Sequence, residues 1–193
     1  MIFLFTTSNK IGARLIRWGD DWDASHFALV PSDRNSPYSV VLESTLADGF
    51  APTWLKSLRK KAEIKHVLLW DLSPEENARL YHKIIDHMAD RDYDKKGVLW
   101  LSVTTLLRKA FRMKLPARNQ WGDRNDVFCS EILQAISGDL EKIGVPMWRF
   151  DPQMLTPKRA YDILLESDQI KEIKNVEPAA KTREPDTASP PVR

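Results

Sequence analysis

The chain has 193 residues, 42% of them hydrophobic, and a formal net charge of +2 at neutral pH. This composition is typical of a globular domain with a real core, and so small a charge gives no argument for a nucleic-acid partner. A single cysteine, Cys129, excludes an internal disulfide and a zinc site built from several cysteines.

Strands are predicted in the first third of the chain. The apolar run from Ile2 to Phe5 is too short for a signal-peptide core or a membrane span, and it predicts a first strand. Two β-branched runs, 26–30 and 38–44, flank the turn-rich segment PSDRNSP and predict a hairpin. The apolar run 62–72 predicts a further strand.

Helices are predicted in the later part of the chain. Ser73, Pro74 and Glu76 have the spacing of a capping box with proline at the first helical position. Three further helices are expected: 98–113, Cys129 to Gly138, and one that starts at Pro157 with Thr156 as its N-cap. Strands grouped first and helices grouped later indicate an α+β fold, with an antiparallel sheet packed against helices.

One folded domain is expected over residues 1–170. Residues 171–193 are rich in proline, alanine and charge, with few large apolar side chains. Such a segment buries too little apolar surface to offset the entropy of ordering it, so a disordered C-terminal tail is predicted there.

Cys129 is the first candidate for chemistry. A thiol at the first turn of a helix lies near free backbone N–H groups and the positive end of the dipole, which favour the thiolate. The same N–H groups stabilise an oxyanion that forms beside the sulfur. The alternative is that Cys129 is a small buried hydrophobic residue, and position alone favours that interpretation.

A thiol nucleophile needs a base with an orienting partner. His26 opens a predicted strand beside a loop, a position from which a side chain reaches a cleft while its backbone stays rigid. Glu43 lies in the neighbouring predicted strand, and a hairpin brings it close to His26, where an acceptor fixes the imidazole tautomer. The alternative places Glu43 on the solvent face of an edge strand.

Several short motifs together resemble a known superfamily. SHFALV, a following strand with Glu43, then YDKKG, FCSEIL and TPKRAYDIL are similar to the circularly permuted branch of NlpC-type, papain-fold cysteine hydrolases. That branch includes YiiX-like and lecithin:retinol acyltransferase-like proteins. The order His26, Glu43, Cys129 along this chain is the permuted order.

The resemblance implies a permuted papain-like fold with the cysteine-bearing helix packed on the sheet. It implies Cys129 as nucleophile, His26 as general base and Glu43 as the orienting residue of a Cys-His-Glu triad. Tyr93, Trp22 and Ser25, which lie in or beside these motifs, are the expected substrate-binding residues. The resemblance implies no metal and no organic cofactor.

The same resemblance implies an amidase or endopeptidase that acts through a thioester, with peptidoglycan peptides or related amides as substrate. Two alternatives stay open. A lipid acyl hydrolase or acyltransferase would use the same triad, and a papain-fold binding module would have lost catalysis. Because no signal peptide or membrane span is recognised, a cytoplasmic location is expected, or a bacterial or phage protein that reaches the wall by another route.

A basic segment precedes the cysteine. Arg108, Lys109 and Arg112 alternate with apolar residues, a pattern that fits an anionic membrane surface. The favoured alternative is a core-facing helix with a solvated basic face. Trp18, Trp22 and Trp121 lie near the motifs and either line a groove or belong to the core.

Overall fold

Six strands form one antiparallel sheet in the order β4-β3-β2-β1-β5-β6. The structure is a computed structural model and describes residues 1–31, 39–45, 48–89, 94–112, 129–149, 151 and 154–173, with backbone alone at 97, 98, 101, 102, 105, 106, 108 and 110. The strands are β1 (Ile2–Thr7), β2 (His26–Val30), β3 (Val40–Thr45), β4 (Gly49–Trp54), β5 (Glu63–Trp70) and β6 (Ile170–Glu172). The predicted antiparallel pairing of β2 with β3 is confirmed.

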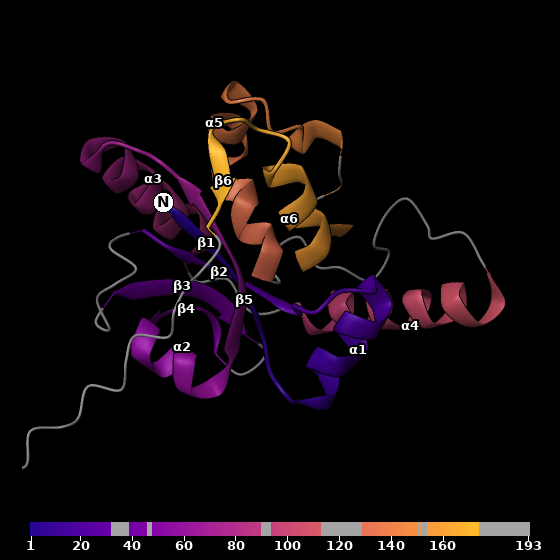
Figure 1. Ribbon diagram of the computed structural model, residues 1–193. Helices are drawn as coiled ribbons and strands as arrows, with labels where there is room; N and C mark the ends of the chain where they lie inside the picture. Colours follow the sequence, from indigo (N-terminus) through magenta and orange to yellow (C-terminus); the bar gives the residue numbers. More distant parts are fainter. Residues whose placement is uncertain are drawn as a thin grey trace, which may run out of the picture.

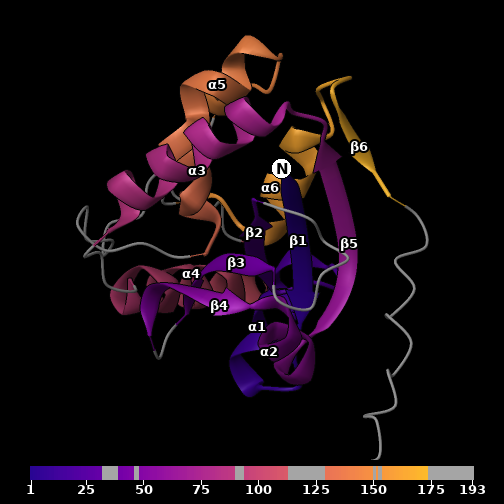
Figure 2. The same ribbon diagram turned by 90° about the vertical axis from the view of Figure 1, so that its left-hand side faces the viewer.

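Helices surround this sheet, as Figures 1 and 2 show. The α-helices are α1 (Ile11–Asp20), α2 (Leu55–Lys61), α3 (Pro74–Met88), α4 (Lys95–Phe111), α5 (Ser137–Lys142) and α6 (Pro157–Leu164). Two segments are 3₁₀-helices, η1 (Cys129–Ile136) and η2 (Met147–Arg149). The α+β class expected from the sequence is confirmed.

The two faces of the sheet have separate cores. Alternate residues of a strand point to opposite faces, so Phe27 and Leu29 lie on one face while Ala28 lies on the other. The first face packs against α3, η1, α5 and α6 and buries most of the aromatic core. The second face packs against Leu55 and Leu58 of α2.

The predicted capping box at α3 is confirmed. The backbone N–H of Glu76 donates to the Ser73 hydroxyl at 3.2 Å, and the Ser73 N–H donates to the Glu76 carboxylate at 3.1 Å. The N-cap of α6 is confirmed too, because the Thr156 hydroxyl accepts from the backbone N–H of Arg159. Local sequence therefore set both helix starts.

The cysteine-bearing segment differs from its prediction. A single α-helix from Cys129 to Gly138 is wrong: residues Cys129–Ile136 form a 3₁₀-helix, and an α-helix follows from Ser137 to Lys142. Most of η1 is buried, so packing against the sheet and α3 decides its winding here.

The described part of the chain continues past the sixth strand to residue 173. β6 pairs with β5, and the Ile173 N–H donates to the Val67 carbonyl at 2.9 Å. The remainder of the predicted tail, 174–193, lies outside the described residues, as do residues 32–38 of the hairpin connection.

A buried carboxylate joins α5 to α3 and gives a first prediction. Asp139 contacts Lys83 at 2.8 Å and Arg79 at 3.1 Å. Burial alone raises the pKa of Asp139, but the hydrogen bonds and charges of Lys83 and Arg79 outweigh it and lower that pKa. The contribution to stability is therefore present above the ordinary value of 3.8 and is lost as the pH falls through the lowered pKa.

Asp139→Asn should accordingly lower the free energy of unfolding at neutral pH by about 1–2 kcal/mol. The effect is no larger because Arg79 and Lys83 are about half exposed, so solvent screens their attraction to the carboxylate. Urea denaturation at neutral and acidic pH measures the difference, which should shrink on acidification. Asp162→Asn is the control, since the exposed pair of Asp162 with Lys158 should contribute less than about 0.5 kcal/mol. An equal loss in both variants, or one independent of pH, would contradict the assignment.

Candidate functional site

The sheet register places His26 and Glu43 on neighbouring strands. His26 is the first residue of β2, and Glu43 lies in β3 opposite Ala28. A residue two positions from the directly opposed partner is the diagonal neighbour on the same face, within reach of a long side chain. The register alone therefore brings the imidazole and the carboxylate together.

The two side chains form a close ion pair. His26 Nε2 donates to Glu43 Oε2 at 3.0 Å. Only 23% of the histidine side chain and 11% of the glutamate side chain are exposed. This contact fixes the ring orientation and leaves Nδ1 for a second partner.

Cys129 supplies that second partner. It is the first residue of η1, is 5% exposed, and begins a segment that contacts both β2 and β3. Its side chain acts on the His26 ring through hydrogen bonding and charge, which raise the pKa of that ring. Three residues that are distant in sequence thus meet in one chain of contacts, from Cys129 through His26 to Glu43.

The charge state of His26 follows from these neighbours. Burial of the ring lowers its pKa, but hydrogen bonding and charge interaction with Cys129, and then with Glu43, outweigh burial. The net effect raises the pKa of His26 from 6.5 to about 10. The ring is therefore protonated at neutral pH and is the counter-ion of two potential anions.

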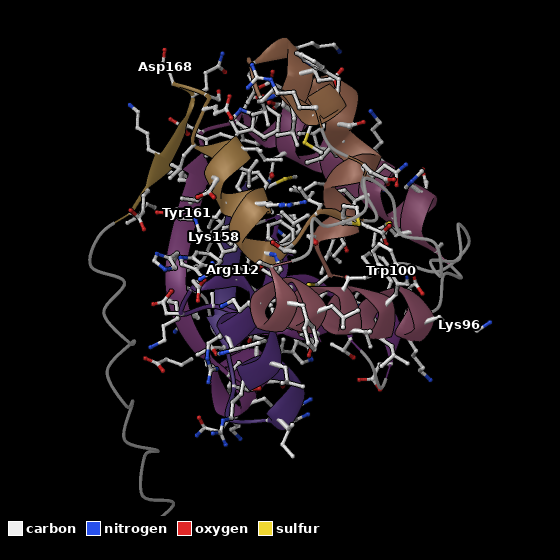
Figure 3. All side chains as sticks on the ribbon, turned by 90° about the vertical axis from the view of Figure 1, so that its right-hand side faces the viewer. Lys96, Trp100, Arg112, Lys158, Tyr161 and Asp168 are labelled. Atoms are coloured by element: carbon white, nitrogen blue, oxygen red, sulfur yellow. The ribbon has the colours of Figure 1, made fainter. Side chains whose placement is uncertain are left out.

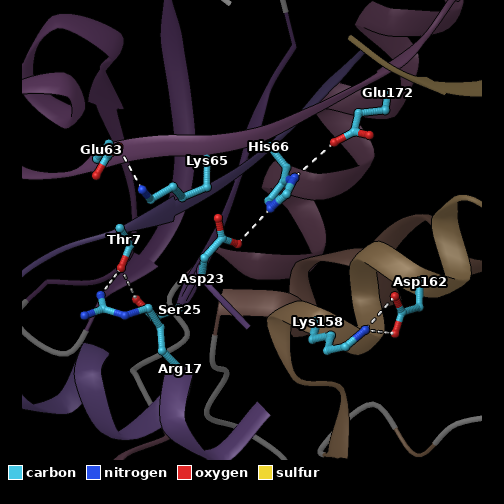
Figure 4. Close-up of polar contacts among 10 residues, drawn as sticks. All are labelled: Thr7, Arg17, Asp23, Ser25, Glu63, Lys65, His66, Lys158, Asp162 and Glu172. Carbon is cyan, nitrogen blue, oxygen red and sulfur yellow. Dashed lines mark hydrogen bonds and ion pairs between the residues drawn. The ribbon is translucent and has the colours of Figure 1, made fainter. Parts of the chain in front are cut away.

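A polar network supports the residue before His26. Arg17 donates to the Thr7 hydroxyl and, at 2.9 Å, to the Ser8 carbonyl, and Thr7 contacts Ser25 at 3.4 Å (Figure 4). The Ser25 N–H donates to the Thr6 carbonyl at 2.9 Å. Ser25, expected at the substrate, is buried and ties the start of β2 to β1 and α1.

A second bond fixes the start of η1. The Ser130 hydroxyl donates to the Leu155 carbonyl, just before α6. Ser130 is fully buried. The residue that follows the cysteine is thus anchored to the segment just before α6, which limits the freedom of the thiol.

A histidine cluster lies beside this network. His66 of β5 contacts Asp23 at 2.8 Å through Nε2 and Glu172 at 3.0 Å through Nδ1 (Figure 4). Each ring nitrogen of His66 therefore lies within hydrogen-bond distance of a carboxylate oxygen. Trp22 stacks on the ring, with centroids 4.9 Å apart, and Tyr161 packs against both.

Burial and the Glu172 carboxylate together raise the pKa of Tyr161 to about 12. Trp22, which the sequence placed near the substrate, is half-buried in this cluster and packs edge-on against Phe5. It also lines an open groove between α1 and the start of β5. Tyr93 and Trp121, the other aromatic residues singled out in the sequence, lie outside the described residues.

The sequence did not predict two groups of contacts near His26. One joins Arg17 and Thr7 to Ser25, and the other joins His66 to Asp23 and Glu172. Only Asp23, which lies two residues before Ser25 of the SH pair, carried a local signal. The partners of His66 are 43 and 106 residues away along the chain, so pattern alone does not pair them.

The basic helix α4 presents a mixed surface. Lys96 points away from the body of the molecule and Trp100 is buried (Figure 3). Leu99, Val103 and Phe111 are exposed, so apolar side chains of α4 occur on both sides of the helix.

Arg108, Lys109 and Arg112 are the three cations that the sequence pattern assigned to a membrane surface. The structure describes only the backbone of Arg108, and the Arg112 side chain is exposed. Lys109 contacts the Trp18 carbonyl and the Asp21 carboxylate and lies over the Trp18 ring. Lys109 is thus engaged in joining α4 to α1.

Within the described ranges no group of three or more His, Cys, Asp or Glu side chains is arranged to hold a metal ion. None of the helices in those ranges is both long enough and apolar enough to cross a bilayer.

Comparison with known proteins gives little beyond this geometry. No family model matches the chain, and no curated protein matches it. Among solved structures, the crystal structure of the metalloprotein YiiX from Escherichia coli O157:H7 is similar, with 17% identity and a TM-score of 0.49. The match covers 92% of this chain and 97% of that one. Any function must therefore come from the residues of this chain.

Proposed function

We propose that the chain is a cysteine-dependent amide hydrolase that acts through a thioester, with Cys129, His26 and Glu43 as its triad. The observation that carries the proposal is the His26 ring, held at 3.0 Å by Glu43 and hydrogen-bonded with Cys129, with its pKa raised to about 10. A protonated imidazole between a carboxylate and a thiol favours the thiolate, which is the nucleophilic form.

In acylation, the Cys129 thiolate attacks the carbonyl carbon and forms the C–S bond. The tetrahedral oxyanion then collapses, the C–N bond breaks, and His26 Nδ1–H gives its proton to the departing amine. His26 holds its proton in the resting state, so it acts first as a general acid. The first backbone N–H groups of η1 are the donors for the oxyanion.

In deacylation, the now neutral His26 takes a proton from water, whose oxygen adds to the thioester carbonyl. The C–S bond breaks, the acid is released, and the thiolate and imidazolium pair re-forms. Glu43 accepts the hydrogen bond from Nε2–H and holds the ring in one tautomer through both steps. The steps balance with water as the sole co-substrate, and neither needs a metal or cofactor.

The fold proposed for this chemistry is a permuted papain-like one. Its support is the chain order His26, Glu43, Cys129 together with the antiparallel strands and the cysteine-bearing η1 that packs on them. By that resemblance, peptidoglycan peptides or related amides are the proposed substrates. A lipid ester or acyl amide is the second candidate, favoured by the exposed Leu15 and Trp18 on α1.

The test is product release from purified peptidoglycan and from a phospholipid panel, with intact-mass detection of an acyl adduct. Wild-type protein should release product from one panel and carry an acyl group on Cys129, whereas Cys129→Ala should do neither. Activity that survives in Cys129→Ala would overturn the proposal. An intact fold with no adduct and no product in either panel would favour a binding module instead.

A further inference from the structure

Helix α1 presents apolar side chains to solvent. Ile11, Leu15 and Trp18 are 76%, 52% and 46% exposed. Their spacing of four and then three residues places them in one stripe along the helix. Gly19 is buried and Ala13, Ile16, Arg17 and Asp20 are half-buried, so one side of α1 lies on the body of the protein while the apolar stripe faces out.

Cations gather around the stripe. Lys10, which directly precedes α1, and Arg14 of α1 are exposed, as are Lys60 and Lys61 at the end of α2. A pocket lined by residues 7–9 and 59–64 places the end of α2 beside the connection between β1 and α1. Figures 1 and 2 show α1 and α2 at the same end of the molecule, opposite α5.

The charge at this end is positive and uncompensated. Within the described residues, no carboxylate forms an ion pair with Lys10, Arg14, Lys60 or Lys61, and three acids of this region are paired with other cations. Those pairs are Asp21 with Lys109, Asp23 with His66, and Glu63 with Lys65.

This combination selects one kind of partner. A second copy of the chain would bring the same cations face to face, which disfavours self-association through this end. A tryptophan in an apolar stripe, flanked by lysine and arginine side chains that extend to the headgroups, is the arrangement of a helix lying on an anionic bilayer.

We propose that the α1–α2 end, defined by Ile11, Leu15, Trp18, Lys10, Arg14, Lys60 and Lys61, docks on an anionic lipid bilayer. The helix lies flat in the interface, with the apolar stripe among the acyl chains and the cations at the headgroups. Lys109 of α4 lies over the Trp18 ring and pairs with Asp21, so α4 borders this surface. The inference does not depend on the hydrolase activity.

The experiment is co-sedimentation with vesicles of phosphatidylcholine alone and of phosphatidylcholine mixed with phosphatidylglycerol. Wild-type protein should bind the mixed vesicles and not the neutral ones, and salt should weaken binding. Leu15→Gln and the double variant Lys60→Glu/Lys61→Glu should each reduce the affinity about tenfold or more.

Trp148→Gln is the matched control, because Trp148 is 75% exposed beside a cation, Arg149, but lies on η2. Cys129→Ala should bind vesicles as wild type does, which separates docking from catalysis. Binding that is absent, equal on both vesicles, or weakened equally by Trp148→Gln would overturn the proposal. So would sedimentation velocity that shows a lipid-free dimer dispersed by Leu15→Gln.

Discussion

His26→Gln should slow alkylation of Cys129 by iodoacetamide about 10²-fold near pH 6, because an ordinary thiol with a pKa of about 8.5 is barely ionised there. In the wild type, His26 has a pKa of about 10 and stays protonated beside the thiol. The wild-type rate should therefore exceed the variant's rate near pH 6, and the two rates should converge as the pH rises toward about 9.

The measurement is the alkylation rate against pH by intact mass, with a small reagent because Cys129 is only 5% exposed. His82→Gln is the control, since His82 is an exposed histidine on α3. If the wild type and His26→Gln share one pH profile, His26 does not activate the thiol. Unchanged circular dichroism excludes unfolding as the cause of any difference.

Glu43→Ala should lower the pKa of His26 and reduce the acylation rate about 10²-fold or more, since the ring loses the acceptor that fixes its tautomer. The His26 Cε1–H resonance, followed by NMR, should not titrate below about pH 9 in the wild type and should titrate at lower pH in the variant. A merely structural role for Glu43 would leave this titration unchanged.

The same variant has a predicted effect on stability. Because folding raises the pKa of His26, the protonated ring stabilises the fold fully below its ordinary value of 6.5. That contribution is lost as the pH rises toward about 10. Glu43→Ala should therefore cost about 1–3 kcal/mol near pH 6 and less at alkaline pH.

Two control variants separate charge from hydrogen bonding. Glu43→Gln keeps an acceptor for the His26 Nε2–H and should therefore recover part of the acylation rate that Glu43→Ala loses. Because the amide is neutral, the pKa of His26 should still be lower than in the wild type. Glu63→Ala removes an exposed carboxylate of β5 and should change neither quantity. A full rate in Glu43→Ala would remove Glu43 from the proposed triad.

Elements with strong local signals were predictable. The capping box at Ser73 and the Thr156 N-cap are short-range chemistry, and both helices begin where the sequence placed them. The hairpin of β2 and β3 brings His26 and Glu43 within 3.0 Å, as expected, while the catalytic roles of the three residues stay predictions.

Elements that tertiary context decides were missed. β4 contains Pro52 and begins at Gly49, two residues that argue against a strand, yet β4 is an edge strand where a missing N–H is tolerated. α1 has no side-chain cap, and Gly19 is its one fully buried residue. Neither a capping motif nor a buried apolar face was therefore available to predict this helix. The His66 cluster joins residues from β5, β6 and the loop before β2, which only the folded sheet brings together.

The 3₁₀ winding of η1 affects how far this segment extends toward His26. A 3₁₀-helix rises about 2.0 Å per residue against about 1.5 Å in an α-helix. Over the eight residues of η1, the difference makes this segment about 4 Å longer than an α-helix of the same sequence. The segment is thus a stretched spacer between α5 and the start of β2, and its length carries the sulfur to the imidazole. Rewinding even part of it into an α-helix would draw Cys129 back from His26 without changing any residue of the triad.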